Sequence, residues 1–151
     1  MTKPCFIRYA NLDDLNQLAP LFNAYRIFYQ QESNLQIAHD FLQQRLALNE
    51  SVILLASDQE GIGLGFIQLY PSFCSIAAAR VWVLYDLFID EAARGQGISR
   101  LLMEKARLHA IQTGAVRLDL STAHSNQRAQ ALYESLGYQP DQTYRYYSLE
   151  I

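Results

Sequence analysis

Cysteine is scarce in this sequence, with only Cys5 and Cys74 in the whole chain. They form no CxxC pair and have no histidine at metal-ligand spacing, so neither a disulfide nor a metal site is predicted. No apolar run approaches the roughly 18 to 20 residues that a membrane span needs. The start, Met1 to Pro4, also lacks the apolar stretch of a signal peptide. We therefore expect a cytoplasmic protein that binds no metal and no membrane.

Positive charge is also in short supply. There are 12 Lys and Arg residues against 15 Asp and Glu, which gives a net charge of -3. A nucleic-acid-binding protein normally shows a basic surplus, so that function is not expected. Apolar residues, in contrast, make up 50% of the 151 residues. A chain of this length and composition can bury one core, and we predict a single domain over residues 1–151.

Apolar side chains at three- and four-residue steps predict two helices in the first third of the chain. The first follows Asn11, which together with Asp14 has the pattern of a helix N-cap, and it extends to about Tyr29. The second, from a less regular pattern, covers Leu35 to Leu48. A short strand at Cys5 to Tyr9 is expected before them.

Strand signals dominate the middle of the chain. The apolar runs Val52 to Ala56 and Gly63 to Tyr70 are separated by the turn-forming residues 58–61, which predicts an antiparallel hairpin. Pro71 is expected to close it. The next strand, Arg80 to Ile89, is almost continuously apolar, as expected for a strand covered on both faces.

The second half of the chain alternates helices and strands. A helix from Ile98 should end at Gly114, with His109 on its polar face, and a strand should follow at 116–121. The strands on either side of this helix should then be parallel. A last helix is expected from Asn126 to Gly137. A final strand from Tyr144 to Ile151 should end the sheet and could pair with a second copy, so we expect a homodimer.

A glycine-rich segment, residues 94–99, joins the predicted strand Arg80–Ile89 to the helix that follows. Backbone N–H groups at a helix start attract phosphate oxygens, and Gly95 and Gly97 would let them approach. A tight turn would explain the same glycines without any ligand. The segment has neither the Gly-Lys-Ser/Thr ending of a P-loop nor the Gly-x-Gly-x-x-Gly of a dinucleotide fold. Another phosphate-bearing ligand is therefore predicted.

Residues 87–98 resemble the strand, loop and helix that bind acetyl-CoA in the GNAT superfamily of N-acetyltransferases. Arg94, Gly97 and Ser99 occupy the positions of the family pattern Arg/Gln-x-x-Gly-x-Gly/Ala, with Ser99 as a small polar departure. A second and independent match is Asn126-x-x-Ala129-x-x-Leu132-Tyr133-x-x-x-Gly137-Tyr138, in which every fixed position of the family pattern is present.

The resemblance implies the GNAT fold, an α/β (α+β) domain with a mixed, mostly antiparallel sheet of about seven strands and about four helices. It implies acetyl-CoA as the cofactor, with the pantetheine paired to a strand and the pyrophosphate held by the glycine-rich segment. Tyr133 would protonate the departing CoA thiolate, although it could instead be a packed helix tyrosine, and Asn126 could be a plain N-cap. The implied cofactor-binding residues are Leu87, Phe88, Ile89, Arg94, Gly95, Gln96, Gly97, Ile98, Ser99, Asn126, Ala129 and Tyr133.

An N-acetyltransferase must remove a proton from its acceptor, because alkylammonium groups have a pKa near ~10.4. Asp86 is the first candidate for the base, since it is the only charge in the apolar stretch 81–89 and burial of a carboxylate is costly. The segment also resembles the acidic strand of polyamine-type GNAT enzymes. Asp86 could instead pair with a nearby Arg or Tyr for structural reasons. Glu32 and Asp119 are weaker candidates.

The acceptor pocket is expected between the first helices and the hairpin. Aromatic side chains beside acids suit a cationic amine, and we predict Tyr29, Glu32 and Tyr70 as substrate-binding residues, with Tyr25, Phe28 and Phe73 nearby. The acceptor could be a small amine, such as a polyamine or amino acid, or a protein lysine. The compact chain favours a small amine. A non-catalytic acyl-CoA sensor would carry the same cofactor motif and is the alternative.

Overall fold

The computed structural model describes residues 3–151, and these divide into two compact units. The first unit extends to Ser121 and contains the sheet, and the second comprises Thr122–Ile151. Within the described residues, no helix is both long enough and apolar enough to cross a membrane.

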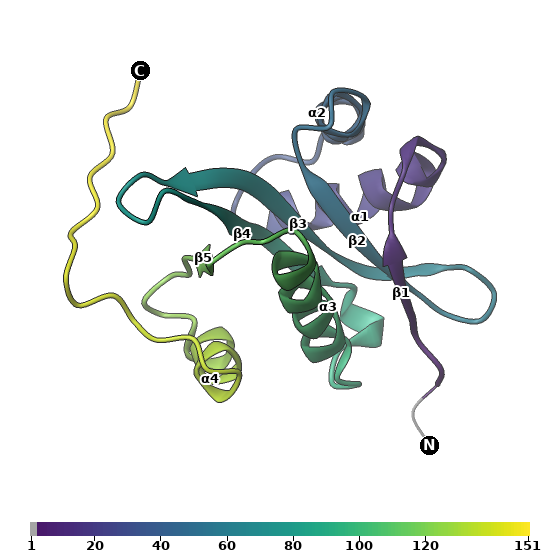
Figure 1. The fold of residues 1–151 in the computed structure, drawn as a ribbon. Helices are drawn as coiled ribbons and strands as arrows, with labels where there is room; N and C mark the ends of the chain where they lie inside the picture. The colour runs from purple at the N-terminus through teal and green to yellow at the C-terminus, as the bar shows by residue number, and fades with distance from the viewer. Residues whose placement is uncertain (1–2) are drawn as a thin grey trace. The chain divides into compact units, whose positions relative to one another are not determined.

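The first unit is built on a mixed sheet whose strands lie in chain order, β1-β2-β3-β4-β5 (Figure 1). Neighbouring strands are antiparallel, except that β4 and β5 are parallel. This single parallel pair flanks a helical crossover, as the sequence predicted. The strands are β1 (Phe6–Tyr9), β2 (Val52–Ser57), β3 (Gly63–Cys74), β4 (Ala79–Ile89) and β5 (Arg117–Leu120).

Helices cover both faces of this sheet. α1 (Leu15–Phe28) and α2 (Leu35–Ala47) lie on one face, and α3 (Ile98–Gln112) lies on the other (Figure 1). Because strand side chains alternate between faces, Phe66 and Phe88 join the core under α1 and α2. Two short 3-10 turns, η1 (Leu12–Asp14) and η2 (Glu91–Ala93), precede α1 and α3.

The predicted helix ends are confirmed. Asn11 and Asp14 form a capping box at η1, which leads directly into α1. Gly114, after the end of α3, has a φ of 74°, and Gly137, after the last helix, has a φ of 95°. Both angles lie in the left-handed region that favours glycine. These ends were predictable because each depends on the conformation of one or two residues.

β3 is longer than the sequence predicted, since Pro71 does not close it. The strand continues to Cys74, and Pro71 lies opposite Trp82 of β4. β2 pairs with β3 only as far as Leu69, so the other edge of β3 is open beyond that point. Proline lacks a backbone N–H and is tolerated at such an open edge.

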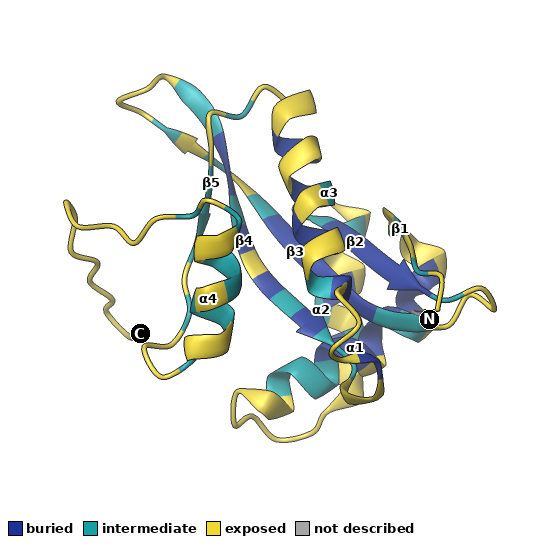
Figure 2. Cartoon of the chain, turned by 90° about the horizontal axis from the view of Figure 1, so that it is seen from below, coloured by how far each residue is buried: buried dark blue, intermediate teal, exposed yellow. Residues whose placement is uncertain are grey.

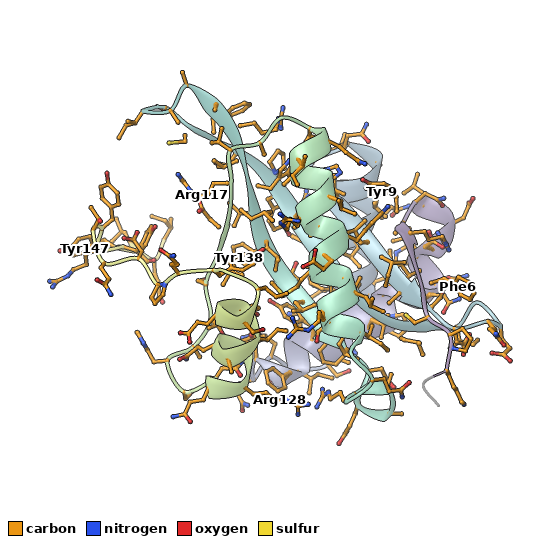
Figure 3. All side chains as sticks on the ribbon, turned by 60° about the horizontal axis from the view of Figure 1, so that its bottom comes forward. Phe6, Tyr9, Arg117, Arg128, Tyr138 and Tyr147 are labelled. Carbon is orange, nitrogen blue, oxygen red and sulfur yellow. The ribbon has the colours of Figure 1, made fainter. Side chains whose placement is uncertain are left out.

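The second unit contains α4 (Gln127–Ser135), which Asn126 caps by accepting a hydrogen bond from the N–H of Ala129 over 3.2 Å. None of its residues is buried, as Figure 2 shows by colour. The predicted final strand is wrong: residues 144–151 have no strand pairing and remain exposed (Figure 3 labels Tyr147). Asp141 instead accepts hydrogen bonds from the N–H groups of Thr143 and Tyr144. Within residues 3–151 the sheet therefore has five strands rather than about seven, and the C-terminal edge strand on which the homodimer prediction rested is not formed.

Candidate active site

One edge of β4 is only partly covered. β3 pairs with β4 along its whole length, whereas β5 pairs only with residues 81–84. Residues 85–89 of β4 therefore have no strand partner on that side within the described chain. The N–H of Asp90 donates a hydrogen bond to the carbonyl oxygen of Leu64 in β3. In an antiparallel pair, the backbone N–H and C=O groups of successive residues point alternately toward and away from the partner strand, so those of Leu87 and Ile89 point toward the open edge. The backbone N–H and C=O of Phe88 point toward β3 instead, so Leu87 and Ile89 are the residues whose backbone groups can pair with an added strand.

A β-bulge at Tyr85 marks the point where this edge opens. Gln68 pairs with Asp86 and Leu69 pairs with Leu84, which leaves Tyr85 without a partner in β3. Such an extra residue bends its strand and re-aims the side chains next to it. Tyr85 is 65% exposed, whereas its neighbours Leu84 and Asp86 are buried. The bulge therefore lies at the start of the open edge, next to the buried carboxylate of Asp86.

The glycine-rich segment turns the chain from the end of β4 into α3. Gly95 and Gly97 have φ angles of 77° and 78°, and no heavy atom lies within 4 Å of the position that a Cβ would take on either glycine. α3 begins at Ile98 with no side-chain cap on its N-terminus. An uncapped helix start carries partial positive charge and N–H groups directed outward. The predicted pyrophosphate cradle is thus open and suited to an anion.

Arg94 folds back over the end of β4. Its Nε donates a hydrogen bond to the carbonyl oxygen of Ile89 over 3.1 Å, and its guanidinium carbon lies 5.6 Å from the centroid of the Phe88 ring. These contacts fix the start of the loop against the strand. They also place a positive charge between the open edge and the cradle, where a phosphate would be stabilised.

Asp86 is 3% exposed and lies on the α1 side of the sheet, on the same face as Phe88. Its Oδ2 accepts a hydrogen bond from Nε2 of Gln68 over 2.6 Å. The hydroxyl of Tyr25, from α1, contacts the carboxylate and also lies 3.4 Å from the carbonyl oxygen of Tyr85. Asp86 has no basic side chain as a direct partner among these contacts.

Burial determines the protonation of this cluster. It raises the pKa of Asp86, and the hydrogen bonds from Gln68 and then Tyr25 lower the same pKa by less. Burial and the Asp86 charge together raise the pKa of Tyr25, and they raise that of Tyr70 as well. Both phenols therefore stay protonated, while the carboxyl is a stronger proton acceptor than an exposed aspartate.

The structure brings some of the predicted acceptor residues together and leaves others apart. Tyr29 contacts Tyr25 with ring centroids 5.0 Å apart, and Tyr70 contacts Tyr85 at 5.5 Å. Glu32 is exposed in the turn between α1 and α2. Phe73 and Asp119 lie outside this cluster. Phe73 is opposite Arg80, toward the hairpin end of β3. Asp119 forms an ion pair with Arg117 on β5 at 2.6 Å (Figure 3 labels Arg117).

Sequence reasoning missed two residues, Gln68 and Ser51. Gln68 is completely buried in β3, and Ser51, just before β2, donates a hydrogen bond to its Oε1 over 2.8 Å. The signal for Gln68 was available, since it is the one long polar side chain within the apolar run Gly63 to Tyr70. The contribution of Ser51 depends on how the strands align, which the sequence does not show.

The remaining predicted residues, Asn126, Ala129 and Tyr133, lie in the second unit. The Asn126 side chain caps α4, so its plain structural role is observed. The ring of Tyr133 lies 6.1 Å from that of Tyr138, as measured between centroids. The roles of Asn126 and Tyr133 toward a cofactor stay predictions.

Comparison with known proteins gives a consistent result. The sequence profile of the acetyltransferase (GNAT) family matches residues 15–138. An uncharacterised N-acetyltransferase of Bacillus subtilis, YhfO, is 45% identical over 96% of this chain and 97% of its own. A probable acetyltransferase of Haemophilus influenzae is 31% identical over 91% of this chain and 92% of its own. The crystal structure of a probable acetyltransferase, 45% identical, superposes with a TM-score of 0.92 and covers 97% of both chains.

Proposed function

The chain belongs to the GNAT family of acetyltransferases, and we propose that it transfers the acetyl group of acetyl-CoA to a small primary amine by direct attack in a ternary complex. The observation that carries this proposal is the open edge of β4 beside buried Asp86. The edge offers backbone groups to one substrate, and the carboxylate offers a proton acceptor to the other.

The first unit has the groups needed to hold CoA. Leu87 and Ile89 would pair with the pantetheine as an added strand, and the cradle of residues 94–99 would bind the pyrophosphate through main-chain N–H groups. The positive φ angles of Gly95 and Gly97 and the open space beside them support this fit. Bound acetyl-CoA supplies the acetyl group as an activated thioester.

Asp86 accepts the proton that the acceptor amine must lose. At 3% exposure its carboxylate is almost closed to direct contact, so the proton passes through a hydroxyl that touches it. Tyr25 is placed to do this, because it contacts Asp86 and is only partly buried. It takes a proton from the amine as it gives its own to the carboxylate, and therefore never becomes a phenolate. Tyr133, by family resemblance, would protonate the CoA thiolate when the new C–N bond forms and the C–S bond breaks, and it would regain its own proton from the acceptor nitrogen, which loses a second proton as it becomes an amide.

The side chains around Asp86 favour a cationic amine. Tyr25, Tyr29, Tyr70 and Tyr85 bring aromatic faces near the Asp86 carboxylate, and such rings attract ammonium groups. A cytoplasmic homodimer remains our proposal for its location and assembly.

The test is an assay of CoA thiol release with polyamines, amino acids, aminoglycosides and lysine peptides as acceptors. We expect release with one class of small amine, and Asp86→Asn should lower kcat/KM by roughly 10²- to 10⁴-fold. Asp119→Asn is the matched control, since Asp119 is partly exposed and already paired with Arg117, and it should keep full activity. Equal losses in both variants, or no amine-dependent release, would reject the proposal.

A further inference from the structure

Three polar side chains form a buried chain across neighbouring strands of the first unit. Ser51 precedes β2, Gln68 lies in β3 and Asp86 lies in β4, and they are 8%, 0% and 3% exposed. Oγ of Ser51 donates to Oε1 of Gln68 over 2.8 Å, and Nε2 of Gln68 donates to Oδ2 of Asp86 over 2.6 Å. These two hydrogen bonds therefore link the start of β2 to the Asp86 carboxylate beside the open edge of β4.

A fully buried glutamine needs an explanation. Burial of an amide costs free energy even when its hydrogen bonds are made, and a methionine of similar size would fill the same space without that cost. The surrounding positions of β3, Phe66, Ile67 and Leu69, are all apolar and buried. Packing alone therefore does not account for Gln68.

The directions of the hydrogen bonds follow from the chemistry of the groups. An ionised carboxylate only accepts, so the amide nitrogen of Gln68 must face Asp86 and its oxygen must face Ser51. Ser51 must then donate its only hydroxyl proton to that oxygen. Reversal of the amide would place two acceptors against each other at Asp86. The carboxylate thus selects this orientation of Gln68, and the Ser51 hydroxyl holds it by donating to the amide oxygen.

We infer that Gln68, held by its hydrogen bond from Ser51, is a positioning residue that keeps the Asp86 carboxyl ionised and fixed in place between turnovers. The inference rests on the proposed role of Asp86 as proton acceptor. Burial favours the neutral form of this carboxyl, and a neutral carboxyl cannot accept a proton. Gln68 opposes that effect more strongly than Tyr25 does.

The other titratable groups that act on Asp86 or its neighbours do not replace Gln68. Tyr25 faces it from α1 and Tyr70 from β3, and both are neutral phenols in the folded protein near pH 7 because their pKa values are raised. Tyr85 precedes it on its own strand. Arg45 of α2 acts on Tyr70, but its guanidinium is paired with Glu50 at 2.8 Å. Gln68 is therefore the strongest hydrogen-bonding stabiliser of the ionised form.

The test measures the titration of Asp86 directly, by carbon NMR of its carboxyl group, with the signal assigned through Asp86→Asn. Gln68→Met should move the titration midpoint to higher pH, and Ser51→Ala should move it in the same direction by less. Ser57→Ala is the matched control, because Ser57 is equally buried at the other end of β2, and it should leave the midpoint in place. The acidic limb of the pH profile of kcat/KM should move with the midpoint, with a roughly tenfold loss on that limb in Gln68→Met.

The outcomes separate this inference from the proposed function. An Asp86 midpoint that is unchanged in both variants overturns the inference. A midpoint that moves while the pH profile of kcat/KM stays fixed supports the coupling of Gln68 to Asp86 and rejects Asp86 as the proton acceptor. If Gln68→Met fails to fold, Ser51→Ala decides the matter, since it leaves Gln68 in place.

Discussion

The hydroxyl of Tyr9 lies 2.8 Å from Nδ1 of His109 and joins β1 to the buried face of α3. Trp82 packs edge-on against the same imidazole, with ring centroids 4.8 Å apart. His109 is 8% exposed, and its buried Nε2 has no hydrogen-bond partner within the described residues. Burial first, and then the charges of Arg80 and Lys105, lower the pKa of His109 from its ordinary value of 6.5.

We therefore predict that acid destabilises the protein through His109. The lowered pKa means that the unfolded chain takes up the proton first, so this contribution is complete above pH 6.5 and is lost as the pH falls toward the folded-state pKa. Urea unfolding at about pH 7.5 and about pH 5.5 should show a lower free energy of unfolding at the acidic pH. His109→Gln should reduce this difference, and His124→Gln, at an exposed position, should not. The same difference in all three proteins would contradict the prediction.

Gly97→Asp should weaken CoA binding by roughly tenfold or more, because a carboxylate would occupy the cradle at the start of α3 and repel the pyrophosphate. Calorimetric titration with CoA measures the effect. Gly61→Asp, in the β2–β3 turn, has a similar positive φ and equally open surroundings, so it matches the backbone strain. It should keep wild-type affinity for CoA. Unchanged affinity in Gly97→Asp would show that the cradle is misplaced.

Gly65→Ala should destabilise the protein by about 2 kcal/mol, because the new Cβ would lie against its neighbour in β4. That Cβ would be 2.6 Å from the carbonyl oxygen of Phe88, a backbone atom that cannot move aside alone. In Gly63→Ala the nearest atom is 3.1 Å away at the end of the flexible Gln17 side chain, so the loss should be smaller. Thermal unfolding of the two variants tests this order, and the reverse order would refute it.

Tyr133→Phe should lower kcat roughly tenfold or more while the affinity for acetyl-CoA stays near that of the wild type. The hydroxyl would act mainly on the departing thiolate, which bears its charge only as the reaction proceeds. Steady-state kinetics with the best amine, together with CoA titration, separate the two effects. Parallel loss of turnover and affinity would indicate a binding role instead.

Local features of the chain were predictable where one residue's own chemistry decides them. Asn11, Gly114 and Gly137 were identified as helix ends from their capping preferences, and the structure places them there. His109 shows the limit of this reasoning. The prediction that it lies on the polar face of α3 is wrong, because helical spacing places it on the buried face with Leu102 and Ala106. Its packing partners, Tyr9 and Trp82, lie in strands β1 and β4, which are distant from α3 along the sequence or separated from it by a loop.

By itself, the sequence determined the family, the positions of most helices and strands, the glycine-rich loop and the candidate Asp86, because these depend on local periodicity and on fixed spacings. The register of β3 against β4, the bulge at Tyr85 and the pairing of Gln68 with Asp86 were decided only by the tertiary structure. The physical reason is that burial and hydrogen-bond partners come from segments distant along the chain. The Asp86 carboxylate is buried only because those segments remove it from water.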